Sequence, residues 1–272
     1  MKIKLNINKD FIGNLFESNM NFPASITYDN SINFESIFNK TSSDIADGKN
    51  ERLAYQPEKL IGFENINLSE KSWFGIDIPV CFSSGRNNKR VIIVAMDPLR
   101  NKSINYNPKE ITLNTPFTIH DIEVKNNYND HIRKLALKYD VYITDAYKLF
   151  YRDEQNYKSM SNRDLKFCSL NVHKEILSKE IEYFKPDFIL CMGNNSAKSV
   201  ASIANFSLKP ITTTNLSVQK KEYNYNSIPV FVIPHASGAS RGSAKKFIEH
   251  HKQEYHSKTY LNDVLNIIEY YL

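Results

Sequence analysis

Residues 185–200 read KPDFILCMGNNSAKSV, and this stretch decides the fold class of the chain. Its first part, 187–192 (DFILCM), is a short apolar run, typical of a strand that is buried on both faces. Gly193 follows at once, and a helical pattern runs over 196–204, as expected for the turn that joins a strand to a helix in a β/α unit. The stretch therefore predicts one such unit.

Similar units recur along the chain. Three further apolar runs predict strands: 91–96 (VIIVAM), 141–144 (VYIT) and 230–233 (VFVI). Helical spacing of apolar residues covers 131–138, 164–184 and 260–272. Strands that alternate with helices predict an α/β sandwich around a mostly parallel four-stranded sheet.

The first 85 residues are different in character. They mix Asn-rich polar stretches with isolated aromatic residues and show no long periodic segment. We predict that residues 1–85 are an N-terminal extension packed on the core, and that residues 86–272 are the main domain.

Composition sets broad limits on function. The chain has 272 residues, of which 41% are hydrophobic and 24% charged, as in a globular protein. It has no apolar stretch of membrane-spanning length and no apolar leader at its start, so we expect a cytoplasmic protein without a membrane partner. Its three cysteines form no CxxC pair, so neither a disulfide framework nor a metal site is expected. The net charge of +5 suits a polyanion but does not demonstrate one.

In open α/β sheets, ligands bind beyond the carboxyl ends of the strands. The segments that follow the four predicted strands are therefore where chemistry is expected. They are DPLRN at 97–101, DAYK at 145–148, GNNS at 193–196 and PHASGASRG at 234–242. Three of them carry an ionisable group at the strand end, namely Asp97, Asp145 and His235.

Taken in order, these segments resemble the uracil-DNA glycosylase superfamily. AMDPL at 95–99 is similar to the family's GQDPY-type motif, and TPF at 115–117 supplies the Phe that stacks on a flipped base. VYITDAYK at 141–148 matches the strand that ends in a base-reading Asn, and KPDFILCMGNNSAKSV resembles the PDVIVALG-type strand and helix. His235-Ala236-Ser237 matches the family's His-Pro-Ser motif.

The resemblance covers roughly residues 90–250. It implies a three-layer α/β sandwich and a monofunctional DNA glycosylase that flips out and excises a base. It also implies single- or double-stranded DNA as the partner, and we expect a monomer that needs no cofactor.

The resemblance implies two catalytic residues. Asp97 would orient the water that attacks the sugar C1′ and stabilise positive charge in the transition state. Its alternative role is a turn carboxylate that caps backbone amides beside Pro98. His235 would donate a hydrogen bond to O2 of the departing base, or it is a strand-end histidine that bonds to nearby backbone.

Other residues would hold the DNA. Phe117 would stack on the extruded base, although a Phe beside a Pro is more often a core residue. Small residues after His235 would let backbone amides approach a phosphate, or form an ordinary tight turn. Basic residues would form a positively charged surface that contacts the DNA backbone, or they are solvated surface residues. The small residues are Ser237, Gly238, Ser240 and Gly242, and the basic ones are Arg241, Lys245, Lys246, Lys102, Lys148 and Arg152.

Two departures from the family pattern bear on the substrate. Leu99 follows Pro98 in the base-binding motif, where uracil-specific members carry a Tyr that blocks C5 substituents. Asp145 replaces the base-reading Asn. An ionised carboxylate accepts hydrogen bonds and donates none, which suits the N4 amino group of cytosine and not O4 of uracil. A protonated Asp145 could instead donate to N3 of cytosine, and Asp145 could also be a helix N-cap.

These departures favour a cytosine modified at C5, a base found in some phage genomes, and phage-restricting members of the superfamily excise such bases. We therefore hypothesise an anti-phage glycosylase. The alternatives are a uracil-DNA glycosylase of base-excision repair, a DNA-binding relative without catalysis, and an unrelated α/β nucleotide hydrolase. A third departure, Ala239 in place of the family's Leu wedge, leaves open which residue enters the DNA stack.

Overall fold

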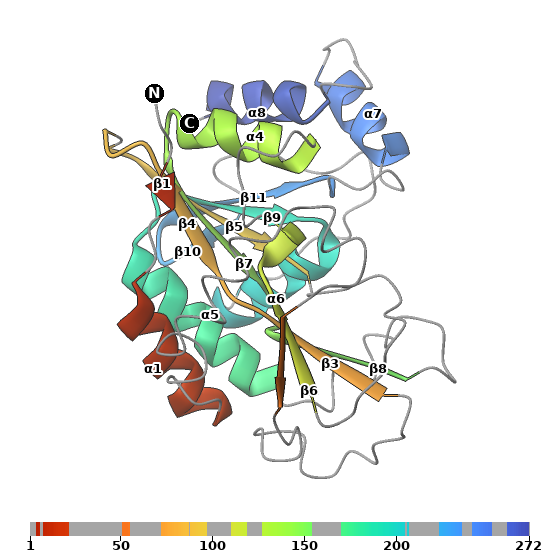
Figure 1. The fold of residues 1–272 in the computed structure, drawn as a ribbon. Coiled ribbons are helices and arrows are strands. Elements are labelled where there is room, and N and C mark those ends of the chain that lie inside the picture. The colour runs from red at the N-terminus through yellow and green to blue at the C-terminus, as the bar shows by residue number, and fades with distance from the viewer. Residues whose placement is uncertain are drawn as a thin grey trace.

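The computed structural model describes residues 4–5, 8–21, 51–54, 72–86, 88–96, 110–118, 127–153, 170–204, 206, 223–235, 241–251 and 260–271. These residues form two β-sheets with helices on both faces of the larger one (Figure 1). Strands of the larger sheet are, in spatial order, β1 (Lys4–Leu5), β4 (Val80–Ser83), β7 (Asp140–Asp145), β5 (Arg90–Ala95), β9 (Phe188–Met192), β11 (Ile228–Ile233) and β10 (Asn224–Tyr225).

The centre of the larger sheet is parallel and its edges are antiparallel. Strands β7, β5, β9 and β11 run in the same direction, whereas β4, β1 and β10 are antiparallel to their neighbours. The prediction of a mostly parallel four-stranded sheet is therefore wrong, because the described sheet is mixed and has seven strands. The added strands have two to four residues, which is too short for a periodic pattern to reveal them.

Helices cover both faces of the larger sheet, which gives three layers (Figure 1). One face carries α4 (Asn127–Ala136), α7 (Arg241–His250) and α8 (Tyr260–Tyr271). The opposite face carries α1 (Lys9–Met20), α5 (Leu170–Phe184) and α6 (Asn194–Ala204). The central strands are buried almost completely between these layers, so the α/β fold class is confirmed.

The expectation that the first 85 residues lack a periodic segment is wrong. Helix α1 spans 12 residues, and the side chain of Asn8 caps it by accepting from the backbone N–H of Phe11. Ile12, Phe16 and Met20 recur at intervals of four and are buried, so the helix packs against α5 through one apolar face. The ring of Phe11 stacks on Tyr183 of α5 at 3.8 Å.

A second, four-stranded sheet adjoins the first. Its order is β2 (Glu51–Ala54), β6 (Glu110–Asn114), β3 (Ser72–Asp77) and β8 (Leu149–Asp153). Two connections join the sheets, because β3 leads into β4 and β7 leads into β8. The two pairs are parts of one long antiparallel arrangement, in which β3 pairs with β8 and β4 pairs with β7. The second sheet therefore continues from the carboxyl end of β7, which is the edge where the ligand is expected.

None of the helices that the structure describes is long and apolar enough to cross a lipid bilayer.

Candidate active site

The carboxyl ends of β5 and β7 lie side by side. Asp145, the last residue of β7, is in register with Ala95, the last residue of β5. The pairing extends past both strands, because Ala146 N donates to Ala95 O and Tyr147 N donates to Met96 O, each at 3.0 Å. Asp145 is 2% exposed. The carboxylate that was predicted to read the base is therefore almost completely withdrawn from solvent.

The predicted catalytic carboxylate follows this paired backbone. Asp97 comes directly after Met96, and it lies outside the described residues, as do Pro98, Leu99 and Lys102. Their roles stay predictions. The structure does describe Met96, whose Sδ accepts a hydrogen bond from Asn195 Nδ2 at 3.0 Å. The backbone that enters the Asp97 motif is thus tied to β7 and to α6.

The ends of β9 and β11 are also joined. Gly193 N donates to Ile233 O at 2.8 Å, and Gly193 has a φ of +88°, which favours glycine. A Cβ at Gly193 would lie 3.9 Å from Cβ of His235. The strand-to-helix turn at 193–194 therefore packs beside the predicted leaving-group donor.

His235 and Phe117 meet at this edge of the sheet. Their ring centroids are 5.9 Å apart, and both side chains are half-buried. Burial lowers the pKa of His235 below its ordinary value of 6.5, so at neutral pH the imidazole is uncharged and donates through a ring N–H. Phe117 lies in the 3₁₀ turn η3 (Pro116–Thr118), which contacts β7. Sequence-predicted residues Asp145, Phe117 and His235 are thereby brought to one edge.

The backbone of Phe117 is strained. Its φ of +57° and ψ of +13° place it in the left-handed region, which is rare for a bulky non-glycine residue. Such conformations persist where the surrounding structure enforces them and are concentrated at ligand-binding sites. Thr115, two residues earlier, is fully buried. Phe117 also packs against the hydrophobic core, so its base-stacking role stays a prediction.

The predicted phosphate contacts are described only in part. Ser237, Gly238 and Ser240 lie outside the described residues. Arg241 is the first residue of α7, and its side chain is likewise outside the description. Lys245 is exposed on α7 and lies 3.6 Å from Glu249 one turn later. The contribution of these residues to a DNA-binding surface stays a prediction.

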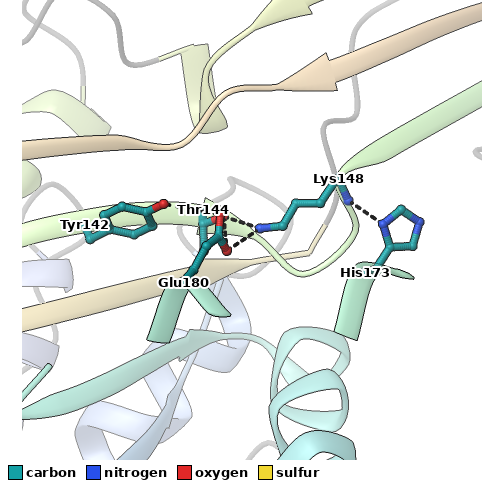
Figure 2. Close-up of polar contacts among 5 residues, drawn as sticks. All are labelled: Tyr142, Thr144, Lys148, His173 and Glu180. Atoms are coloured by element: carbon teal, nitrogen blue, oxygen red, sulfur yellow. Dashed lines mark hydrogen bonds and ion pairs between the residues drawn. The ribbon is translucent and has the colours of Figure 1, made fainter. Parts of the chain in front are cut away.

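One predicted surface lysine is in fact a core residue. Lys148 and Glu180 have fully buried side chains, and Lys148 Nζ lies 2.6 Å from Glu180 Oε2 (Figure 2). The prediction that Lys148 contributes to a positively charged surface for the DNA backbone is therefore wrong. Its ammonium group is paired with the Glu180 carboxylate inside the protein, between β7 and α5, and cannot reach a phosphate.

Sequence reasoning missed Glu180 and His173, both on α5. His173 is buried, and its Nδ1 accepts a hydrogen bond from the backbone N–H of Lys148 at 3.1 Å (Figure 2). Burial, assisted by the nearby Lys148 charge, lowers the pKa of His173 to about 3. The signal that could have found both residues is their spacing with Ile176 and Leu177, which places polar groups on the apolar face of the helix.

The family profile described as the uracil DNA glycosylase superfamily matches residues 82–264. The chain belongs to this superfamily. A comparison with curated proteins gave no match.

Membership confirms the resemblance that the motifs predicted. The uracil DNA glycosylase superfamily consists of DNA-acting glycosylases and also includes members without catalytic activity. In this superfamily member the matched range begins within β4 and includes every sequence-predicted site residue. Helix α1 and strands β2 and β3 precede the match, and the predicted boundary of the extension at residue 85 stays a prediction.

Proposed function

We propose that this protein is a monofunctional DNA glycosylase that removes a C5-modified cytosine from phage DNA and leaves an abasic site. The observation that carries the proposal is the burial of Asp145 at the end of β7, beside the end of β5 that leads into Asp97. Uracil-reading members carry an Asn at the matching strand end. A carboxylate there changes the hydrogen-bonding pattern that is offered to the base.

The argument for cytosine rests on donors and acceptors. An ionised carboxylate only accepts, and the N4 amino group of cytosine only donates, so the two are complementary. The O4 atom of uracil would face another acceptor. A mismatch at a buried polar contact costs about 1–3 kcal/mol, which is enough to reverse a preference between two bases. The 2% exposure of Asp145 leaves little water to relieve such a mismatch.

The argument for a C5 substituent rests on Leu99. Uracil-specific members place the flat ring of a Tyr against C5, and the shorter Leu leaves room there. The second sheet continues from the carboxyl end of β7 (Figure 1), and we infer that this sheet or the segment 100–130 accommodates the substituent.

The chemistry would proceed by hydrolysis. A water held by Asp97 gives a proton to that carboxylate and adds its oxygen to C1′, while the bond between C1′ and the base nitrogen breaks. The electron pair of that bond leaves with the base, and negative charge develops at O2. His235 would donate a hydrogen bond there, while the ring of Phe117 supports the extruded base at the same edge.

The test uses duplexes that differ in a single base. Oligonucleotides with one 2′-deoxyuridine, 2′-deoxycytidine, 5-methyl-2′-deoxycytidine or 5-hydroxymethyl-2′-deoxycytidine are incubated with the protein, and abasic sites are cleaved with alkali. DNA from phages with different base modifications is treated in parallel, and released bases are identified by mass spectrometry. We expect release of a C5-modified cytosine and no release of unmodified cytosine.

Other outcomes would contradict the proposal in different ways. Release from uracil alone would identify a repair glycosylase and overturn the modified-cytosine substrate. DNA binding without release of any base would identify a non-catalytic relative. The variant Asp97→Ala supplies the catalytic control, since it should bind DNA and release no base.

A further inference from the structure

A cluster of polar side chains lies buried directly behind the proposed base-reading residue. Lys148 Nζ donates to Glu180 Oε2 at 2.6 Å and also donates to the hydroxyl of Thr144. Thr144 Oγ1 is 3.0 Å from each carboxylate oxygen of Glu180, and the hydroxyl of Tyr142 donates to Oε1 at 3.3 Å. Figure 2 shows these groups converging between β7 and α5. We refer to Tyr142, Thr144, Lys148 and Glu180 as the Glu180 cluster.

Stability alone is a weak reason for such a cluster. Burial raises the pKa of Glu180, and that shift is opposed by the Lys148 charge and by hydrogen bonds from Lys148, Thr144 and Tyr142. Removing two charges from water costs free energy that their attraction does not always recover, so an apolar pair would often hold the same elements together as well. In some proteins, buried ionic groups instead impose one geometry on the chain around them.

Two residues of the Glu180 cluster lie on either side of Asp145 in the sequence. Thr144 precedes it and Lys148 follows it by three positions, and both bond to the same carboxylate on α5. Because successive side chains of a strand point to opposite faces, anchoring Thr144 against α5 directs Asp145 away from that helix. Lys148 is held a second time, through its backbone, by His173.

On the side that faces β4, the segment 144–148 leaves the regular strand ladder, whereas Thr144 and Asp145 stay paired with β5. Ile76 pairs with Leu149 and Val80 pairs with Ile143. Only residues 77–79 lie between these pairs on one strand, whereas residues 144–148 lie between them on the other. The extra length forms a bulge, a feature that re-aims side chains next to active sites. Without ladder bonds to β4, the segment depends on α5 and on β5 for its position.

We propose that the buried Lys148–Glu180 ion pair is a positioning element that fixes the direction of the Asp145 carboxylate and thereby sets which base is released. This inference rests on the proposed base-reading role of Asp145. Lys148 and Glu180 have no exposed side-chain surface, so they act through Asp145 and do not touch the DNA.

The test removes both charges together. The double variant Lys148→Met with Glu180→Gln leaves no unpaired buried charge, so it should fold. Its matched control is Lys138→Met with Glu269→Gln, which removes an ion pair of similar length, 2.7 Å, at the surface. Single-turnover base release and DNA affinity are measured for both. We expect release by the buried variant to fall by about tenfold to a hundredfold with DNA affinity retained, and the control to stay within about twofold of the wild type.

A double-mutant cycle separates positioning from general support. The buried variant is combined with Asp145→Ala, and release of 5-hydroxymethylcytosine, cytosine and uracil is compared. If the ion pair acts through Asp145, the combined variant releases bases no more slowly than Asp145→Ala alone. The proposal would be overturned if the buried double substitution lowered base release by the same factor in the Asp145→Ala background as in the wild type. The ion pair would then support the fold in general.

Two further outcomes are distinguished. Should the double variant fail to fold, Thr144→Val keeps the ion pair and removes the hydroxyl that both charges contact. It should then show a smaller loss of release that likewise vanishes in the Asp145→Ala background, and an additive loss would overturn the proposal. A wild-type protein that releases no base from any duplex would instead overturn the proposed function and this inference with it.

Discussion

The ring of Phe117 lies 5.9 Å from the imidazole of His235, and the two ring planes are inclined by 55°. One residue comes from a strained 3₁₀ turn after β6 and the other from the loop after β11. A base stacked on Phe117 would therefore have the imidazole beside its edge, which is where a hydrogen-bond donor to a leaving group is needed. We therefore expect Phe117 to bind the base by stacking and His235 to assist its departure by donating a hydrogen bond.

His235→Ala should lower the rate of base release by about 10²–10³, the usual loss when one preorganised donor to developing charge is removed. DNA affinity should change little, because the bond to O2 strengthens only as the base departs. Single-turnover release and a binding titration measure the two quantities. His250→Ala, at an exposed position on α7, is the control, and an equal loss in that variant would contradict the assignment.

Phe117→Gly and Phe117→Ala should lose base release to a similar extent, because both remove the stacking ring. Their stabilities should differ. Glycine adopts the φ of +57° at Phe117 without a Cβ clash, so Phe117→Gly should be more stable than Phe117→Ala by up to about 1 kcal/mol. Chemical denaturation measures this difference. A more stable alanine variant would show that the left-handed backbone conformation at this position is not maintained.

Asp145→Asn should shift the preference toward uracil, because an amide both accepts and donates where the carboxylate only accepts. The ratio of release rates from duplexes with uracil and with 5-hydroxymethylcytosine measures the shift, which we expect to be about tenfold or more. Asp140→Asn changes the first residue of the same strand and is the matched control. If Asp145→Asn unfolds the protein, Asp145 is a structural cap and the specificity argument fails.

His173 should make the protein less stable in acid. Its pKa is about 3 in the folded state and 6.5 in the unfolded chain, so the unfolded state takes up a proton first as the pH falls. The free energy of unfolding should therefore decrease by about 1.4 kcal/mol per pH unit below pH 6.5, down to about pH 3.

His173→Asn tests this pH dependence. The Asn amide oxygen can still accept from the backbone N–H of Lys148, while the titrating group is gone. Denaturation curves between pH 7 and pH 4 should then show a shallower loss of stability than the wild type. A parallel loss in both proteins would mean that other groups account for the acid sensitivity.

Single variants of the buried ion pair should be far less stable than the double variant. Lys148→Met leaves the fully buried Glu180 without its ion-pair partner, which costs about 3–5 kcal/mol. Adding Glu180→Gln removes the unpaired charge, so the double variant should recover most of that loss. Thermal unfolding of the three proteins provides the comparison, and additive losses would show that the two groups do not interact energetically.

Sequence patterns were sufficient for the elements that are buried on both faces. The apolar runs at 91–96, 141–144, 187–192 and 230–233 correspond to β5, β7, β9 and β11, because a strand between two helical layers must be apolar throughout. The order of the strand-end motifs was sufficient for the superfamily. Both signals can be read along the chain, because each motif is a run of adjacent residues and only the order of the motifs is compared.

Patterns were insufficient where structure depends on a distant partner. Strands β1 and β10 have two residues each, and their conformation follows from pairing with β4 and β11. The second sheet combines segments from four separate parts of the chain. The short polar segment at 145–148 gives no indication that its lysine is buried.

The amino-acid sequence by itself thus determined the parallel core, the glycosylase superfamily and the identities of Asp97, Asp145 and His235 as candidates. Only the tertiary structure decided that Phe117 reaches His235 and that Lys148 turns inward to Glu180, 32 positions away. The physical reason is that an apolar run needs burial wherever it lies, whereas a buried ion pair such as Lys148–Glu180 forms only when folding brings the two charges together.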